Sequence, residues 1–422
     1  MKYGIGYTYI DEMRKGHHDI TQFSKAFEAA KDRLVATGTF SHDRYIQHSS
    51  NAVGRVGNAG GELAEKYVWC TNHYLGLNRH PAVVRATAEA IAKYGTGSGT
   101  SAMSGGRCEL HVEIEDFLRD FLRKEEVILF PTGYTTNLGM LPTIVQKGDV
   151  IITDEENHAS IIDGIKLSRR DKLVFKHNDL DDLERQLIAA EGKYKNKFVV
   201  LESVYSMSGD VAPLREIVAL KRKYGFYLFV DEAHSFGFYG AGGRGLADEL
   251  GVLEDVDFMT GTFSKSCASI GGFCTFSERF RTFVMYRSSS YIFQATFPPS
   301  AAATTLAALR LFSSDGGFAE RLMAKNAYMR RALLKAGFDL GTSSSPVIPI
   351  FIPDFDKLKA FERELYRRGV FSVSITYPAV QIHEGRIRLI VNDSHSYEDI
   401  DATVGILAEL AEKYEVYEGV MA

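Results

Sequence analysis

Short apolar runs alternate with amphipathic stretches from about Tyr67 onward, and this alternation predicts an α/β fold. Several of the apolar runs lack polar alternation, which is expected of strands that helices cover on both faces. Helical stretches such as Leu180–Ala190 and Leu214–Tyr224 separate them, which makes βαβ units and a mostly parallel seven-stranded sheet. The expected strands are Val127–Phe130, Val150–Thr153, Leu173–Lys176, Phe198–Glu202, Tyr227–Val230, Asp257–Thr260 and Gly272–Phe276.

The rest of the chain predicts an N-terminal arm and a smaller C-terminal α+β domain. Residues 1–60 are polar and mixed, with a helix around Ile20–Thr37 and a loose segment through Gly54–Gly57. We expect an arm at 1–60, a large domain at 61–305 and a small domain at 306–422, with a ligand in the cleft between the domains. The elements expected at the C-terminal end are helices at Ser300–Ser313, Phe318–Ala336 and Tyr397–Tyr414, and strands at Val347–Ile352, Val370–Thr376 and Arg386–Val391.

Composition excludes several classes of protein. The 422 residues are 45% hydrophobic and 24% charged, which is ordinary for a globular protein, and the net charge of −5 argues against a nucleic-acid partner. Four cysteines without CxxC or zinc spacing predict neither a disulfide scaffold nor a metal site. The N-terminal stretch lacks a signal-peptide core, and no apolar run is long enough for a membrane span. The expected location is the cytoplasm.

The segment with the most chemical information surrounds Lys265. This lysine follows a predicted strand, within the run TGTFSKSCASIGG of hydroxyl and glycine residues. Glycines let a bulky cofactor approach the backbone, and hydroxyls bind phosphate. A lysine taken alone is more often a surface residue, but a lysine held in such a pocket can form an imine.

A carboxylate ends the strand that comes before. Asp231 lies at the carboxyl edge of the sheet, where open α/β folds bind ligands, and can pair with a protonated pyridine nitrogen. The alternative for Asp231 is a helix N-cap, and the two interpretations are about even for this residue alone. Together with Lys265 after the next strand, however, it forms a stronger joint signal.

Polar residues follow the other strands as well. Thr132–Asn137 precedes a helix whose N-terminal amides suit a phosphate, although the segment lacks the lysine of a P-loop. His158 can stack on a planar ring, whereas a lone histidine is more often structural. Ser203 and Ser206 offer hydroxyls to a ring oxygen. Packing alone does not explain so many polar side chains at one edge.

These segments resemble the α-oxoamine synthases, pyridoxal 5′-phosphate (PLP) enzymes of fold type I that condense an amino acid with an acyl thioester. The resemblance runs from about Tyr67 to the C-terminus and includes Asn72–Leu77, which is similar to the N-x-Y-L-G segment of that family. Ser264 makes the lysine motif most similar to serine palmitoyltransferase, since the other branches usually have Gly there; VWCTNHYLG is similar to aminolevulinate synthase. The other matching segments are GTFSKSCASIGGF, VDEAHSFGFYG, FPTGYTTN, DEENHASIIDG and SVYSMSGDVAPL.

The resemblance implies a role for each matching residue. Lys265 would hold PLP as a Schiff base and then remove the α-proton of the amino acid, Asp231 would pair with the pyridine nitrogen, and His158 would stack on the ring. Arg388 would bind the substrate carboxylate through its planar guanidinium; Arg386 is its rival, and an exposed strand arginine is the alternative for both. The other implied contacts are His234 and Ser206 with the ring oxygen, Gly133, Tyr134, Thr262 and Thr296 with the phosphate, and Asn72 and Tyr74 with the substrate.

The implied reaction joins a small L-amino acid, with Ser favoured, to an acyl-CoA and releases CO₂ to leave an α-amino ketone. Alternatives are another α-oxoamine synthase (5-aminolevulinate synthase, glycine C-acetyltransferase or 8-amino-7-oxononanoate synthase), a synthase with an acyl carrier protein donor, a PLP aminotransferase or retro-aldol lyase, and a catalytically silent partner subunit. Ala102 replaces the usual Arg of the Gly-rich loop and Arg107 stands where Thr is usual, which motivates the specialised donor. The family further implies a homodimer with shared active sites, in which the partner subunit supplies Thr296.

Overall fold

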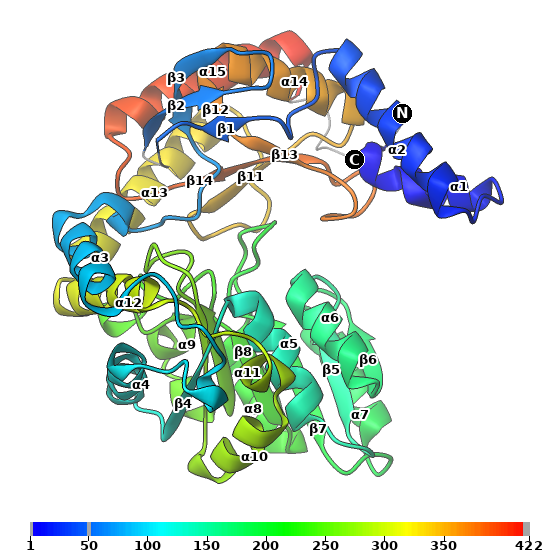
Figure 1. Cartoon of the computed structure of the whole chain (residues 1–422). Coiled ribbons are helices and arrows are strands. Elements are labelled where there is room, and N and C mark those ends of the chain that lie inside the picture. Colours follow the sequence, from blue (N-terminus) through cyan, green and yellow to red (C-terminus); the bar gives the residue numbers. More distant parts are fainter. Residues whose placement is uncertain (1–2, 49–51, 417–422) are drawn as a thin grey trace. The chain divides into compact units, whose positions relative to one another are not determined.

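The computed structural model describes residues 3–48 and 52–416, which divide into two compact units (Figure 1). The larger unit comprises Leu75–Ser206 and Asp210–Arg321. The smaller unit comprises the described residues up to Tyr74, Met207–Gly209, and the described residues from Leu322 on. This grouping differs from the division expected at 60 and 305, because the N-terminal residues pack with the C-terminal ones.

A seven-stranded sheet forms the centre of the larger unit. Its strand order is β4-β10-β9-β8-β7-β5-β6, and every neighbouring pair is parallel except those of β10. All the strands expected here are confirmed, with ends that differ by two residues at most. The strands are β4 (Glu126–Phe130), β5 (Val150–Asp154), β6 (Asp171–Phe175), β7 (Lys197–Glu202), β8 (Tyr227–Asp231), β9 (Phe258–Thr262) and β10 (Gly272–Phe276).

Helices connect these strands and bury both faces of the sheet. The predicted bounds of α7 (Leu180–Ala190) and α8 (Leu214–Tyr224) are confirmed. The remaining helices that begin in the larger unit are α3 (Pro81–Tyr94), α4 (Glu109–Leu122), α5 (Gly133–Ile144), α6 (Ala159–Ser168), α9 (Leu246–Glu249), α10 (Arg281–Arg287), α11 (Ser289–Ile292), α12 (Pro299–Ser314) and α13 (Gly317–Lys335). Short 3-10 turns lie at Leu77–Arg79, Ala102–Ser104, Ala241–Gly243, Leu253–Asp255 and Glu278–Phe280.

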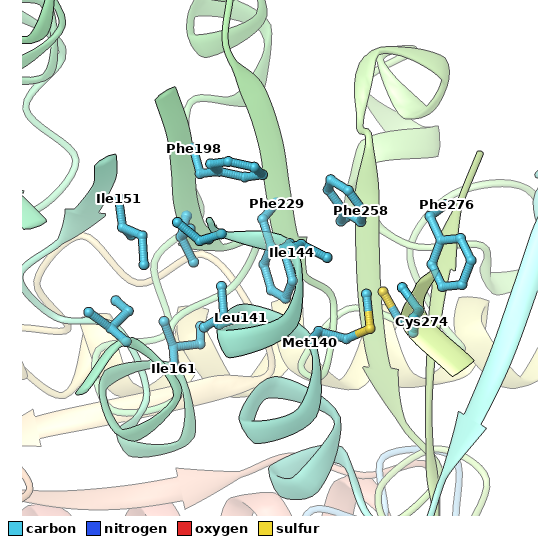
Figure 2. Packing of buried hydrophobic residues seen from close by; sticks show 14 of the residues in the cluster. Met140, Leu141, Ile144, Ile151, Ile161, Phe198, Phe229, Phe258, Cys274 and Phe276 are labelled. Atoms are coloured by element: carbon cyan, nitrogen blue, oxygen red, sulfur yellow. The ribbon is translucent and has the colours of Figure 1, made fainter. Parts of the chain in front are cut away.

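The main core lies between one face of this sheet and helices α5 and α6. Figure 2 shows Met140, Leu141 and Ile144 of α5 packed toward Phe229 and Phe258 of the central strands. Neighbouring residues on these strands, such as Leu228 and Val230 beside Phe229, are equally buried but face the opposite side of the sheet. Strands that are covered on both faces have no polar face to display, which explains why their sequences do not alternate.

The smaller unit contains two sheets and the helices that flank them. One sheet has the order β1-β2-β3-β12, and the other has the order β11-β14-β13. Both chain ends contribute to the first sheet, since β3 pairs with β12 through Tyr67 and Val370. The elements are α1 (Thr8–Arg14), α2 (Ile20–Ala36), β1 (Tyr45–Ile46), β2 (Val53–Gly57), β3 (Leu63–Val68), β11 (Val347–Phe351), α14 (Phe355–Arg367), β12 (Val370–Phe371), β13 (Val373–Ile375), β14 (Arg386–Ile390) and α15 (Tyr397–Tyr414), after a 3-10 turn at Ile5–Tyr7.

Two local expectations in this unit were wrong. The single strand expected at Val370–Thr376 is divided into β12 and β13, which belong to different sheets. The segment Gly54–Gly57, expected to be loose, lies in strand β2, which pairs along its length with β3. Its composition of two glycines and an arginine hides the strand, because the pairing partner rather than the local propensity decides the structure. Just after β3, Trp69 is fully buried, stacks on His395 with ring centroids 3.7 Å apart, and donates its ring N–H to Thr403 (3.0 Å).

Among the described residues, no helix combines the length and the apolar character that a bilayer crossing requires.

Candidate active site

The carboxyl ends of the central parallel strands meet at one edge of the large sheet. Glu202 at the end of β7 is in register with Asp231 at the end of β8, and Asp231 is in register with Thr260 of β9. A cavity of about 300 Å³ opens there, which lies at the small end of the range for small-molecule sites. Its lining residues are Thr132, Gly133, Tyr134, Asn137, His158, Ser160, Glu202, Asp231, Ala233, His234, Thr262, Ser264, Lys265, Ile270 and Gly271.

Lys265 reaches the cavity from the loop between β9 and β10. The loop folds back on itself, because the N–H of Phe263 donates to the carbonyl of Gly271 (3.0 Å) and the N–H of Ser269 donates to the carbonyl of Phe263 (2.9 Å). The hydroxyl groups of Thr262 and Ser264 lie 2.8 Å apart beside the lysine. The loop therefore presents one amine and two hydroxyls on a short, internally bonded frame.

Asp231 is a buried carboxylate with defined donors. Its Oδ2 accepts a hydrogen bond from Asn137 Nδ2 (2.7 Å) and its Oδ1 accepts one from the N–H of Ala233 (2.9 Å). The bond from Ala233 resembles that of a helix N-cap, which was the alternative role expected for Asp231, because Ala233 begins the turn after β8. Asp231 therefore presents a carboxyl group, held in place by two donors, to a cationic group in the cavity.

His158 lies at the N-cap of α6 with its ring in the cavity. Its Nδ1 lies 2.7 Å from Ser160 Oγ and accepts the backbone N–H of Ser160 (3.2 Å). Burial lowers the pKa of His158, Asp231 opposes this effect, and Lys265 adds to it. These effects favour a neutral imidazole.

Glu202 is a second buried carboxyl group in the cavity. Its Oε1 accepts the N–H of His158 (2.6 Å), which joins the end of β7 to the start of α6. Burial raises the pKa of Glu202 well above its usual value, and the neighbouring Asp231 raises it further. The two carboxyl groups on adjacent strands differ in their donors, because Glu202 accepts a backbone N–H, whereas Asp231 accepts a side-chain amide and a backbone N–H.

The N-terminus of α5 forms another wall. Thr132 caps the helix by accepting the N–H of Thr135 (3.0 Å), and Gly133 and Tyr134 follow at the cavity. A Cβ on Gly133 would lie 2.7 Å from the Cβ of Thr262, and a Cβ on Gly272 would lie 2.7 Å from the backbone nitrogen of Gly133. Only glycines allow this close approach, which brings the helix N-terminus, an anion-binding feature, beside the lysine loop.

A charged cluster supports the sheet edge beside the cavity. His177 lies between Asp154 at the end of β5, with Nδ1 to Oδ1 at 2.9 Å, and Asp210, with Nε2 to Oδ2 at 2.6 Å. Burial lowers the pKa of His177, but the two carboxylates outweigh this effect and raise it to about 10. The imidazolium therefore ties the loop after β7 to β5.

The structure brings seven of the predicted site residues together and places the others elsewhere. Lys265, Asp231, His158, His234, Gly133, Tyr134 and Thr262 all line the cavity. Ser206 and Thr296 are buried in the larger unit but do not line it. Thr296 is tied instead to the Gly-rich loop of its own chain, since its N–H donates to the carbonyl of Thr100 (3.1 Å). Asn72, Tyr74 and Arg388 belong to the smaller unit.

Of the predicted substrate residues in the smaller unit, Tyr74 is buried, and Asn72 and Arg388 are half-buried. Burial lowers the pKa of Arg388, while Tyr74 and Cys70 raise it, so these groups are neighbours. Its rival Arg386 is engaged otherwise, with an ion pair to Glu384 (3.2 Å). Asn72 Oδ1 is buried without a hydrogen-bond partner among residues 3–48 and 52–416.

The two departures in the Gly-rich loop have local explanations. Arg107 forms an ion pair with the buried Glu115 of α4. Burial raises the pKa of Glu115, while Arg107 lowers it. Ala102 begins a 3-10 turn and packs against the main core. The cation of Arg107 thus serves the fold of its own loop.

Sequence reasoning assigned no role to Asn137, Ser160 or Glu202. Glu202 and Asp231 both end apolar strands, so their pairing in register was the available signal. Asn137 lies one turn after Gly133 in α5, and Ser160 lies two residues after His158, so both were inside quoted motifs. Their contacts depend on side-chain directions, which no spacing rule provides.

Comparison with known proteins identifies the family. The model of the aminotransferase class I and II family matches residues 64–407. The chain belongs to this family. Its relatives include the 8-amino-7-oxononanoate synthase of Alkaliphilus metalliredigens (strain QYMF), which is 38% identical over 82% of this chain and 88% of the relative. They also include the serine palmitoyltransferase of Caulobacter vibrioides (strain NA1000 / CB15N), which is 39% identical over 82% of this chain and 86% of the relative.

Solved structures of this family agree with the fold. The serine palmitoyltransferase of Sphingomonas wittichii superposes with a TM-score of 0.89 at 32% identity, covering 94% of this chain and 100% of that one. A serine palmitoyltransferase from S. paucimobilis with a bound PLP-myriocin aldimine superposes equally well, with a TM-score of 0.89 at 31% identity. The chain is therefore a PLP-dependent α-oxoamine synthase of fold type I, which confirms the family, enzyme class and cofactor expected from the sequence.

The cavity of this chain fits the cofactor. The helix N-terminus with its glycine contacts suits a phosphate, Lys265 supplies an amine, and Asp231 supplies a buried negative charge. These are the three chemical groups that PLP requires of a protein.

Proposed function

We propose that the protein catalyses the decarboxylative condensation of L-serine with a long-chain acyl-CoA, in the manner of serine palmitoyltransferase. The observation that carries the proposal is the convergence of Lys265, Asp231 and His158 in one cavity at the carboxyl edge of the sheet. Both Ser264 in the lysine loop and the similarity to solved serine palmitoyltransferases support this branch.

In the proposed reaction, the bound PLP stabilises negative charge at the α-carbon of the amino acid. Lys265 holds the cofactor and then accepts the α-proton at Nζ. Asp231, which accepts hydrogen bonds from Asn137 and the N–H of Ala233, would pair with the pyridine nitrogen and keep the ring electron-poor. The N-terminal amides of α5 and the Thr262 hydroxyl hold the phosphate.

The remaining roles concern substrate and ring position. His158 faces the ring, and His234 and Ser206 contact the ring oxygen. Arg388 binds the amino-acid carboxylate, and Asn72 and Tyr74 contact the substrate. The buried Oδ1 of Asn72, which has no partner among the described residues, can accept a hydrogen bond from a donor group of the ligand. Thr296 completes the phosphate site from the partner subunit of a homodimer, which is supported by its position outside the cavity lining of its own chain.

A second candidate is a synthase of the 8-amino-7-oxononanoate type. The curated relatives of that type are about as similar to this chain as the serine palmitoyltransferase, at 38% against 39% identity. The product in their name, 8-amino-7-oxononanoate, carries amino and oxo groups on neighbouring carbons, which is the outcome of the same condensation. The amino acid and the acyl group are therefore what an experiment has to decide.

The first experiment identifies the attachment site. Borohydride reduction of the holoenzyme followed by peptide mapping should find a pyridoxyl group on Lys265. Lys265→Ala should carry no label and lose turnover, whereas Lys166→Ala, which removes an exposed lysine on α6, should keep both. A label on another lysine would refute the proposed chemistry.

The second experiment decides the substrates. Serine, alanine and glycine are each supplied with palmitoyl-CoA or with a short acyl-CoA, and free thiol and CO₂ are measured together. Serine with palmitoyl-CoA should release both. Turnover with alanine alone would favour the oxononanoate branch, and amino-group exchange with a keto acid but no thiol release would indicate an aminotransferase.

A third comparison concerns the donor. If the changes at Ala102 and Arg107 specify an acyl carrier protein, palmitoyl-CoA should be a poor substrate beside palmitoyl carrier protein. Full activity with palmitoyl-CoA would remove that variant of the proposal. The ion pair of Arg107 with Glu115 supports a CoA donor, because the cation already has a partner in its own loop.

A further inference from the structure

A continuous set of hydrogen bonds joins Asp231 to His158 through two residues with no assigned role. One amide hydrogen of Asn137 Nδ2 goes to Asp231 Oδ2 (2.7 Å) and the other goes to Ser160 Oγ (2.9 Å). The Ser160 hydroxyl lies 2.7 Å from His158 Nδ1. All four groups are in the larger unit and line its cavity.

The orientation of the Asn137 amide determines the direction of the two bonds that it donates. Thr260 donates its hydroxyl to Asn137 Oδ1 (3.2 Å), and the reverse orientation of the amide would turn its oxygen toward the carboxylate of Asp231. The amide nitrogen therefore faces Ser160, whose oxygen accepts. The hydroxyl hydrogen of Ser160 is then available for His158 Nδ1.

A second donor fixes the protonation of the ring. The backbone N–H of Ser160 also points at His158 Nδ1 (3.2 Å), and a backbone N–H can only donate. A nitrogen that accepts two hydrogen bonds carries no proton, so the proton of a neutral ring lies on Nε2. We propose that Asn137 and Ser160 are positioning residues that hold His158 as the Nε2–H tautomer, with its donor directed away from α6.

The charges around His158 are consistent with this state. Asp231 and Asp163 attract a proton to the ring, Lys265 repels it, and burial opposes the charged form. The Tyr134 ring lies edge-on at 6.2 Å, and Glu202 holds the backbone N–H. The positioning role rests on the proposed function of His158, because an Nε2–H donor can serve the ring or the substrate only if His158 acts on them; the tautomer itself does not depend on the reaction.

The test measures the tautomer directly. Long-range ¹H–¹⁵N correlation spectra of the ¹⁵N-histidine-labelled holoenzyme distinguish the two nitrogens, and His158→Asn assigns the signal. The wild type should show an unprotonated Nδ1 and a protonated Nε2 at neutral pH. A proton on Nδ1, or an imidazolium, would overturn the proposal even if the enzyme proves fully active with serine and palmitoyl-CoA.

Two variants separate the roles of Ser160 and Asn137. Ser160→Ala removes one donor to Nδ1, so the proton affinity of His158 in an NMR pH titration should rise about fivefold, with PLP affinity kept within about twofold. Asn137→Leu removes the donor to Ser160 Oγ and the donor to Asp231 Oδ2. Because Asp231 loses a partner, PLP should bind roughly tenfold more weakly in absorbance titrations. Thr143→Val, which deletes a buried hydroxyl bonded to Gly139 on the same helix α5, should change neither quantity.

These measurements also reveal a purely structural role. If Ser160→Ala leaves the His158 titration unchanged, or weakens PLP binding as much as Asn137→Leu does, Ser160 does not act through the imidazole and the proposal is refuted. The wild-type tautomer remains decisive if either variant fails to fold. If His158 is found as the Nε2–H tautomer but the condensation assay fails, the proposed function is refuted and the tautomer proposal stands.

Discussion

Replacement of His177 by glutamine tests the charged cluster at the sheet edge. The variant keeps a polar side chain of similar reach but removes the cation that lies between Asp154 and Asp210. Two carboxylates with little exposure then lose their counter-charge. Loss of one partner from a buried ion pair costs about 3–5 kcal/mol, and we expect a destabilisation of this order.

The raised pKa of His177 determines how the destabilisation by His177→Gln changes with pH. The folded pKa of His177 is raised from 6.5 to about 10. Its contribution to stability is fully present below the unfolded pKa and is lost as the pH rises through the folded one, with a slope of about 1.4 kcal/mol per pH unit. The destabilisation by His177→Gln should therefore be largest near about pH 6 and smaller by about 3 kcal/mol near about pH 9.

Thermal unfolding of the holoenzyme over a pH series measures both effects. For a unit of this size 1 kcal/mol shifts Tm by about 2 °C, so the difference between wild type and variant should fall from roughly 6–10 °C by several degrees. Taking the difference at each pH removes changes common to both proteins, and His18→Gln at an exposed site supplies the control. A difference that stays constant, or grows with pH, would refute the assignment of a charged His177.

Four further substitutions test the site, the backbone and the core. Asp231→Asn should reduce turnover about 10²-fold or more without unfolding the protein, as measured by steady-state rates and circular dichroism, and near-normal turnover would contradict the charge pairing. Gly272→Ala should destabilise by about 1–3 kcal/mol and weaken PLP binding, because its Cβ would lie 2.7 Å from the Gly133 nitrogen. The helical Gly405→Ala, with no atom within 4 Å of the added Cβ, should instead stabilise by about 0.5–1 kcal/mol in the same thermal assay. Phe258→Ala, at a fully buried position in the main core, should cost about 3–5 kcal/mol in denaturant unfolding, and a loss below 1 kcal/mol would contradict its packing.

The sequence predicted the large sheet well because burial on both faces leaves an unambiguous pattern. Runs such as Val150–Thr153 have no polar interruption, and their order along the chain determines which residues stand at strand ends. Lys265, Asp231 and His158 could be found in this way. The strand at Val53–Gly57 could not, because it is stabilised by pairing with β3 and not by its own side chains.

The parts of the site that escaped prediction depend on side-chain geometry. Asn137 reaches Asp231 from a helix that begins after a different strand, and no local pattern reports such a contact. Ser206 and Thr296 illustrate the converse, since their residue types fitted the expected roles but neither lines the cavity of its own chain. Residue type and position at the strand ends identified where the candidate active site lies. Only the three-dimensional contacts show which residues belong to it.

The pairing of β3 with β12 has a consequence for biosynthesis. Lys66 of β3 donates to the carbonyl of Tyr366, 300 positions later in the chain. The successive βαβ units of the larger unit can form while translation proceeds, since their partners are close in sequence. The pairing of β3 with β12, in contrast, must wait until Val370 and Phe371 have left the ribosome. A nascent chain arrested before β12 should therefore leave its first 74 residues sensitive to protease while the large sheet is already protected.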